Sequence, residues 1–178
     1  MKQLKEYTIK FVGLKEGKHC FEYQIEKKFF EDFEYDEYND ANVLAKVILN
    51  KKTTLLELNF NISGTVNVNC DLTNEPFDQK IINQFDLVVK FGEEFNDEND
   101  EILIIPHAEY EINIAQYLYE LIVLSVPSKR VHPGVADGSL KSDILKRLED
   151  LSPKDIKEND KEETDPRWNI LKKLLTDK

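Results

Sequence analysis

The sequence predicts an α+β fold: a mainly antiparallel β-sheet, arranged as a meander or a partly closed barrel, with one buried central helix and further helices at the C-terminus. Two observations predict it. Segments in which apolar and polar residues alternate recur through roughly the first hundred residues, separated by polar or glycine-containing turns. Beyond Asn113 the apolar residues instead recur every three or four positions, as on one face of a helix.

The N-terminal segments predict a hairpin followed by a short helix. Leu4–Val12 alternates roughly as a strand, and Gly13–Gly17 supplies a turn before the alternation resumes at Phe21. Between Lys27 and Tyr38, three phenylalanines at helical spacing lie among acidic residues. We therefore expect a short amphipathic helix there, with an aromatic face.

Four longer strands should follow. They are rich in Val, Ile, Thr or Leu, and their expected ranges are Val43–Leu49, Thr54–Ile62, Thr65–Cys70 and Gln79–Phe91. We interpret residues 50–52 and the pair Ser63-Gly64 as turns. The first three of these strands are therefore expected to pair antiparallel, in meander order.

An acidic loop, Glu93–Glu101, should lead to a compact strand at Ile102–Ile105. Asn113 then precedes a segment with apolar residues on all sides, and Gln116 lies three positions later, as in a capping box. Pro127 ends this segment because it disfavours helical geometry at the residue before it. We expect it to be the central buried helix.

The C-terminal part predicts a loop, a helix, a tether and a last helix. Ser128–Ser139 contains proline and two glycines, whereas Leu140–Leu151 carries apolar residues on one helical face. Between Ser152 and Thr164 only one residue is apolar, so no core can form there. Asp165-Pro166 has the order of a helix cap and first helical position. The expected parts are an acidic α+β domain (residues 1–151), a flexible charged tether (152–164) and a short amphipathic helix (165–178).

The net charge of −11 is unevenly distributed. From Leu151 onward seven basic residues balance seven acidic ones, so the first 150 residues carry the whole excess. No Lys or Arg occurs between Phe91 and Ser128, where nine Asp and Glu residues do. Such a field repels a nucleic-acid backbone and attracts basic proteins. An alternative interpretation is a solvated surface that only keeps the protein in solution.

Composition predicts a soluble cytoplasmic protein that is not an enzyme. The N-terminus lacks the apolar core of a signal peptide, and the longest apolar stretch, Ile112–Val126, is too short and too polar to span a membrane. Cys20 and Cys70 are expected to be reduced thiols. Neither a nucleophile elbow, a glycine-rich phosphate loop nor a metal-binding carboxylate motif occurs. We therefore expect no catalytic residues, no metal and no cofactor.

Two segments are candidates for binding a partner. A local basic patch contains Lys129, Arg130 and His132, backed by Lys141, Lys146 and Arg147. It either contacts phosphate, or Lys129 and Arg130 simply cap the carboxyl end of the buried helix. The last helix is marginal alone in water, so it must dock onto its own domain or onto a partner, anchored by Trp168. The candidate partner-binding residues are Lys129, Arg130, His132, Arg167, Trp168 and Leu171.

Four motifs, in order along most of the chain, are distinctive. They are GTVNVNCDLTNEPF, the strand ending LVVKFG, the block IIPHAEYEINIAQYLYELIVLSVPSKRVHPG and the terminal DPRWNILKKL. Together they resemble the YceD family, whose members are associated with accumulation of the large-subunit ribosomal RNA. The wording of these motifs resembles that of Bacteroidetes-type members.

The resemblance implies a ribosome-biogenesis factor with no established catalytic activity. In this family the gene commonly lies beside that of a small basic ribosomal protein, so the implied partner is a ribosomal protein or a pre-large-subunit particle, with at most a weak RNA contact. Many relatives carry Cys-x-x-Cys where this chain has Cys70 and Thr73. Any metal or redox property of that pair is thus expected to be absent here. The alternatives are an RNA-processing or RNA-modifying enzyme, or an interaction module unrelated to ribosomes.

Overall fold

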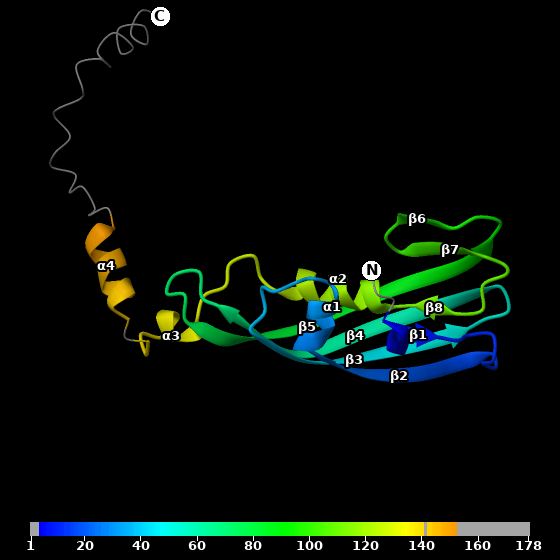
Figure 1. Ribbon diagram of the computed structural model, residues 1–178, viewed down its shortest axis with the longest axis horizontal. Coiled ribbons are helices and arrows are strands. Elements are labelled where there is room, and N and C mark those ends of the chain that lie inside the picture. Colours follow the sequence, from blue (N-terminus) through cyan, green and yellow to red (C-terminus); the bar gives the residue numbers. More distant parts are fainter. Residues whose placement is uncertain (1–3, 141, 153–178) are drawn as a thin grey trace, which may run out of the picture. The chain divides into compact units, whose positions relative to one another are not determined.

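The computed structural model describes residues 4–140 and 142–152. These residues belong to two compact units, Met1–Lys141 and Ser142–Lys178, and each unit is described by itself. The first unit is built on a six-stranded β-sheet, with helices and a small second sheet packed on one of its faces (Figure 1). In the second unit, the described residues form the helix α4 (Asp143–Leu151).

The large sheet is open and has the strand order β2-β3-β4-β5-β7-β6. Its four long strands form an antiparallel meander: β2 (Gly17–Glu26), β3 (Asp40–Lys51), β4 (Leu55–Asn69) and β5 (Pro76–Gly92). The strand β7 (Ile102–Pro106) runs parallel to the end of β5, and β6 (Asn96–Asn99) pairs antiparallel with β7. The predicted α+β fold with a mainly antiparallel sheet is confirmed, and β2 and β6 form the two edges of the sheet.

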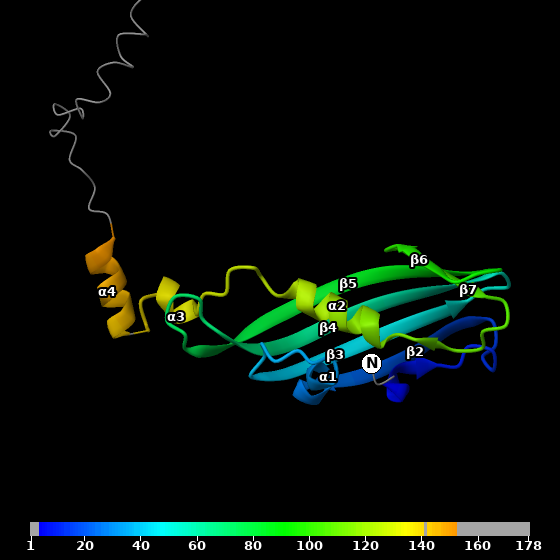
Figure 2. The same cartoon turned by 45° about the horizontal axis from the view of Figure 1, so that its top comes forward.

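One face of this sheet is covered and the other is open (Figures 1 and 2). The covering elements are α1 (Lys27–Asp32), α2 (Ala115–Ser125) and the small sheet of β1 (Thr8–Ile9) and β8 (Ile112–Asn113). The 3₁₀ helix η1 (Lys5–Tyr7) leads into β1, and the short helix α3 (Pro133–Ala136) follows α2. Side chains of both layers belong to one hydrophobic core.

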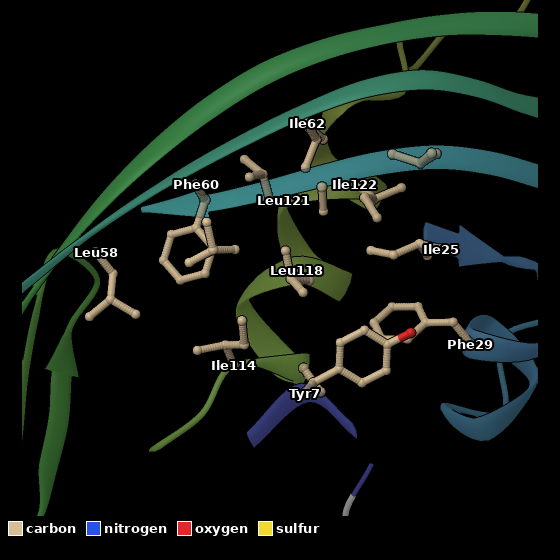
Figure 3. Close-up of a cluster of buried hydrophobic side chains, with 14 of the residues drawn as sticks. Tyr7, Ile25, Phe29, Leu58, Phe60, Ile62, Ile114, Leu118, Leu121 and Ile122 are labelled. Atoms are coloured by element: carbon tan, nitrogen blue, oxygen red, sulfur yellow. The ribbon is translucent and has the colours of Figure 1, made fainter. Parts of the chain in front are cut away.

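The helix α2 supplies the centre of that core. Ile114, Leu118 and Ile122 are fully buried, and Figure 3 shows them among side chains from β2 and β4, including Ile25 and Phe60. The predicted burial of this segment is therefore confirmed on one side. Its opposite side faces solvent, where Leu124 is 80 % exposed.

The predicted turn at Ser63-Gly64 is wrong, because β4 runs through it as one continuous strand. Its buried residues keep the same alternation on both sides of the pair, from Leu56 to Val68. Gly64 lies directly opposite Val43, and a Cβ atom at Gly64 would come within 2.7 Å of the Val43 Cα. The glycine thus allows two backbones to approach closely.

The predicted helix from Lys27 to Tyr38 is also too long, since α1 ends at Asp32. Glu34 has a φ of 58°, the left-handed conformation that follows many helix ends. The Glu34 N–H donates to Glu31 O and the Tyr35 N–H to Phe30 O, both at 3.0 Å. This is a Schellman motif, and the Tyr35 and Phe30 rings pack beside it.

The N-terminal strand pairs with β8 and not with β2, so the predicted hairpin is wrong. The side chain of Asn113 makes this connection: its amide donates to Leu4 O and Thr8 Oγ1, and its Oδ1 accepts from the Ala115 N–H. Gln116 bonds to Glu120 instead of completing a capping box.

Three smaller differences concern the predicted loops and the later helix. The acidic loop contains β6, and the Ser128–Ser139 loop contains α3. The helix predicted from Leu140 begins at Asp143, because Ser142 is its N-cap and Ser142 Oγ accepts a hydrogen bond from the Ile144 N–H at 3.3 Å. The strand predicted at Ile102–Ile105 is confirmed as β7.

Candidate functional site

The loop that carries the predicted basic patch is tied to the turn that follows β4. The Asp71 N–H donates to Arg130 O at 2.8 Å, and the Arg130 N–H donates to Asp71 Oδ2 at 2.6 Å. Asp71 thus holds this loop through both the C=O and the N–H group of Arg130. Arg130 and His132 are thereby brought close to the end of β4 and the start of β5.

Arg130 uses its guanidinium within the protein. Nη1 lies 3.3 Å from Glu37 Oε2, and Nε lies 3.5 Å from Asp71 Oδ1. The arginine side chain is only 29 % exposed. These two carboxylates outweigh its single positive charge, so a phosphate group meets a cluster of net charge −1 at Arg130. The Arg130 guanidinium is therefore bound to Glu37 and Asp71. The sequence also allowed a different role for it, a cap on the carboxyl end of α2.

His132 holds the backbone of the loop in a fixed geometry. Its Nδ1 accepts from the Gly134 N–H at 2.9 Å and so caps α3. Its ring packs edge-on against Phe77, with 5.4 Å between ring centroids. These contacts leave the imidazole half-buried, with one nitrogen used in capping.

The His132 N–H donates to Cys70 Sγ at 3.3 Å. Burial acts to raise the pKa of the Cys70 thiol, but hydrogen bonds from the His132 backbone, the Thr73 hydroxyl and nearby backbone N–H groups outweigh it and lower that pKa. Cys70 and Thr73 are both buried. Cys70 and Thr73 therefore stabilise the turn between β4 and β5, and Val66, Val68 and Phe77 are also buried.

Of the predicted basic patch, Lys129 remains exposed. Lys146 and Arg147 lie on α4 in the second unit, where Lys146 pairs with Asp143 at 3.5 Å. Arg167, Trp168 and Leu171 lie outside the described residues. Glu37 and Asp71, which pair with Arg130, are absent from the predicted site, because 93 and 59 residues separate them from it and no local pattern links them.

The segment without Lys or Arg forms an exposed acidic margin, which we define as Glu93–Glu101 with Glu109. All its carboxylates are exposed: those of residues 93–101 lie on β6 and the turns beside it, and that of Glu109 lies in the turn after β7. Two aromatic side chains are exposed here as well: Phe95 at 60 % and Tyr110 at 55 %. Negative charge and the exposed ring of Phe95 are thus combined at the β6 edge of the sheet, whereas Tyr110 lies in the segment after β7, where its carbonyl accepts from the Val12 N–H.

The open face of the sheet is polar and rich in amides. Gln24 Nε2 donates to Asn42 Oδ1, and Asn67 Nδ2 donates to Asp78 Oδ1, both at 2.7 Å. Leu44 and Ile82 are exposed on this face beside a shallow groove of about 490 Å³.

Within residues 4–140 and 142–152, no three His, Cys, Asp or Glu side chains come together in a way that could hold a metal ion. None of the helices in that part of the chain combines the length and apolar composition needed to cross a bilayer.

Comparison with known proteins gives one match. Residues 58–175 match the family described as large ribosomal RNA subunit accumulation protein YceD. This range starts within β4 and covers β5 and α2 together with the tied loop. Neither the curated proteins nor the solved structures include a significant match to the chain. Because the matched range exceeds half of its length, the chain belongs to the YceD family of large ribosomal RNA subunit accumulation proteins.

Proposed function

We propose that this protein is a non-enzymatic, cytoplasmic ribosome-biogenesis factor that supports accumulation of the large-subunit ribosomal RNA by holding a basic ribosomal protein. Family membership supports the ribosomal role. The observation that carries the partner assignment is the acidic margin, whose carboxylates are all exposed on a body of net charge −11. Basic ribosomal proteins have the opposite charge, and complementary charge speeds and steers their association with such a surface.

The cations offer little support for tight direct RNA binding. Arg130 is already paired with Glu37 and Asp71, and Lys129 is the exposed cation of that loop. An RNA contact that depends on a few dispersed cations is weak and falls steeply as salt rises. We therefore assign any RNA contact of this loop a secondary role, and the Trp168 segment remains a candidate hook for a further partner.

The first test asks whether the protein travels with ribosome precursors. In a sucrose gradient of native lysate, it should co-migrate with precursors of the large subunit. A protein that stays at the top of the gradient under all salt conditions would contradict the ribosomal role.

The second test addresses the acidic margin with purified components. The variant Asp97→Asn/Glu98→Gln/Asp100→Asn should bind basic proteins extracted from the large subunit about tenfold more weakly, because three facing charges are removed. Glu6→Gln/Glu31→Gln/Asp36→Asn removes the same charge from other exposed positions and serves as the control. Equal loss in both variants would show that net charge alone, and not the margin, attracts the partner.

A further inference from the structure

The two edges of the sheet differ in how they are protected from pairing with another strand. The edge strand β6 has four residues, all polar and exposed, and an irregular register against β7. Short length, charge and irregularity are the means by which proteins block edge-to-edge association. The other edge, β2, has ten residues, contains no proline and pairs with β3 in unbroken register. β2 therefore lacks the protections of short length and irregular register, although it carries the charged residues Lys18, Glu22 and Glu26.

The hydrogen bonds at the strand ends show which backbone groups of β2 are free. The Lys52 N–H donates to Leu55 O at 3.0 Å across the turn from β3 to β4, so even-numbered residues of β3 point their N–H and C=O groups toward β4. Odd-numbered residues of β3 consequently point toward β2 and pair with odd-numbered residues there, such as Tyr23 opposite Ala45. The even-numbered residues of β2 therefore direct their N–H and C=O groups away from the sheet. These residues are Lys18, Cys20, Glu22, Gln24 and Glu26, of which Glu26 offers only its N–H because its carbonyl, at the N-cap, begins α1.

The side chains of β2 divide in the same way. The even-numbered residues are all exposed on the open face of the sheet. On the covered face, Phe21 and Tyr23 are only partly buried although both pack against the core. A strand placed beside β2 would cover the remaining aromatic surface and pair the free backbone groups at once.

We propose that the occupant is a second copy of this chain, with β2 pairing antiparallel to β2 of the partner subunit about a two-fold axis at Glu22. In this register Lys18 faces the partner's Glu26, and Glu26 faces the partner's Lys18. On the covered face, Phe21 faces the partner's Tyr23. The two Glu22 side chains meet at the axis, where each has Lys46 of its own chain at 3.5 Å to offset its charge.

Two arguments favour a second copy over a basic peptide. The residues of β2 and its flanks, from Lys15 to Lys28, carry four basic and three acidic side chains, so this edge is not the acidic surface that a basic peptide would select. The pattern is instead complementary to itself, because reversal of the strand places opposite charges together.

The register follows from the same groups. Only even-numbered residues have free backbone groups, so any alternative register shifts by two residues. A shift in one direction places Glu26 opposite the partner's Glu16, beyond the end of the partner's β2, and a shift in the other places Lys18 opposite the partner's α1, which begins at Lys27. Either arrangement loses the attractive pairing of Lys18 with the partner's Glu26.

Charge reversal tests the pairing in the full-length protein. Sedimentation velocity over a concentration series should show reversible association to twice the monomer mass of 20.8 kDa. Lys18→Glu and Glu26→Lys should each weaken association about tenfold, because each places two like-charged pairs across the interface. An equimolar mixture of the two variants should associate as well as the wild type, since opposite charges then meet at both pairs.

A mixture that associates no better than either variant alone, or a wild-type protein that stays monomeric at every concentration, would overturn the proposal. Both positions are exposed, and unchanged thermal midpoints of the variants would show that folding is not the cause.

Disulfide trapping tests the register independently. In the proposed pairing Cys20 faces the partner's Gln24, at a separation suited to a disulfide. Gln24→Cys should therefore give a covalent dimer under mild oxidation, with loss of the band on reduction. Lys18→Cys is the matched control, because residue 18 faces the partner's residue 26, and it should remain monomeric on the same gel. Equal trapping of both variants, or of the wild type through Cys20 alone, would contradict this register.

Discussion

Gly64 shows how one residue type can serve two different structures. A Ser-Gly pair between apolar segments is typical of a turn, yet here the strand β4 continues through it. The decisive signal is the parity of the buried residues. Leu56, Phe60, Val66 and Val68 all occupy even positions, which a single strand requires and which a turn need not preserve.

The first residue-scale prediction concerns Gly64→Ala. The added Cβ would meet the Asn42 carbonyl oxygen and the Val43 Cα, which belong to a neighbouring backbone and cannot rotate away. We expect a loss of about 3 kcal/mol in the free energy of unfolding, measured by urea denaturation. Gly13→Ala is the control, because nothing lies within 4 Å of its Cβ position. A loss below about 1 kcal/mol at Gly64 would mean that the strands can separate easily.

The candidate site shows where single-residue inference from sequence reaches its limit. Arg130 and His132 were identifiable from their charge and their loop, whereas Cys70, expected as a half-buried strand residue, is almost fully buried just after the end of β4. Their environment was not identifiable. Asp71 lies 59 residues from Arg130, and Glu37 lies 93 residues from it, so only the fold brings these charges together.

At the scale of elements, periodicity predicted most of the strands but could not predict their partners. Alternation places β3 and β5 correctly because each buries one face. The pairing of β1 with β8 depends on the Asn113 side chain, and the parallel pairing of β7 with β5 depends on how the chain turns at β6. Neither interaction leaves a local trace in the sequence.

The aromatic cluster around α1 leads to a prediction about alkaline pH. Tyr7 packs against Tyr23 and Phe29. Burial, assisted by the charges of Glu6 and Asp32, raises the pKa of Tyr7 from 10.0 to about 12. Burial also raises the pKa values of Tyr23, Tyr35, Tyr38 and Tyr117. Because the neutral phenol is favoured in the folded state, this stabilisation is complete below pH 10 and is lost as the pH rises through about 12.

The free energy of unfolding, measured by circular dichroism, should therefore fall steeply between pH 10 and 12. In the Tyr7→Phe variant this fall in the free energy of unfolding should be smaller by an amount on the order of 2 kcal/mol. At neutral pH the same substitution should change the free energy of unfolding by less than about 1.5 kcal/mol. Tyr110→Phe provides the control, since Tyr110 is 55 % exposed and should leave the slope unchanged. A Tyr7→Phe variant with the wild-type slope would show that other groups govern the alkaline transition.

At the scale of the whole molecule, the first unit contains the entire described sheet and core, and the second begins at Ser142. The chain has one tryptophan, Trp168, near its C-terminal end. If the last segment acts as a hook for a partner, Trp168→Ala should leave the thermal midpoint of the sheet within about 2 °C of the wild type, because the core loses no contact. Leu118→Ala is the matched control: this side chain is fully buried in α2, and its truncation should cost about 3 kcal/mol and lower the midpoint by roughly 10 °C. Circular dichroism at the same protein concentration measures both. A fall after Trp168→Ala as large as that of Leu118→Ala would place Trp168 in the core of its own domain, and the hook would then have to be abandoned.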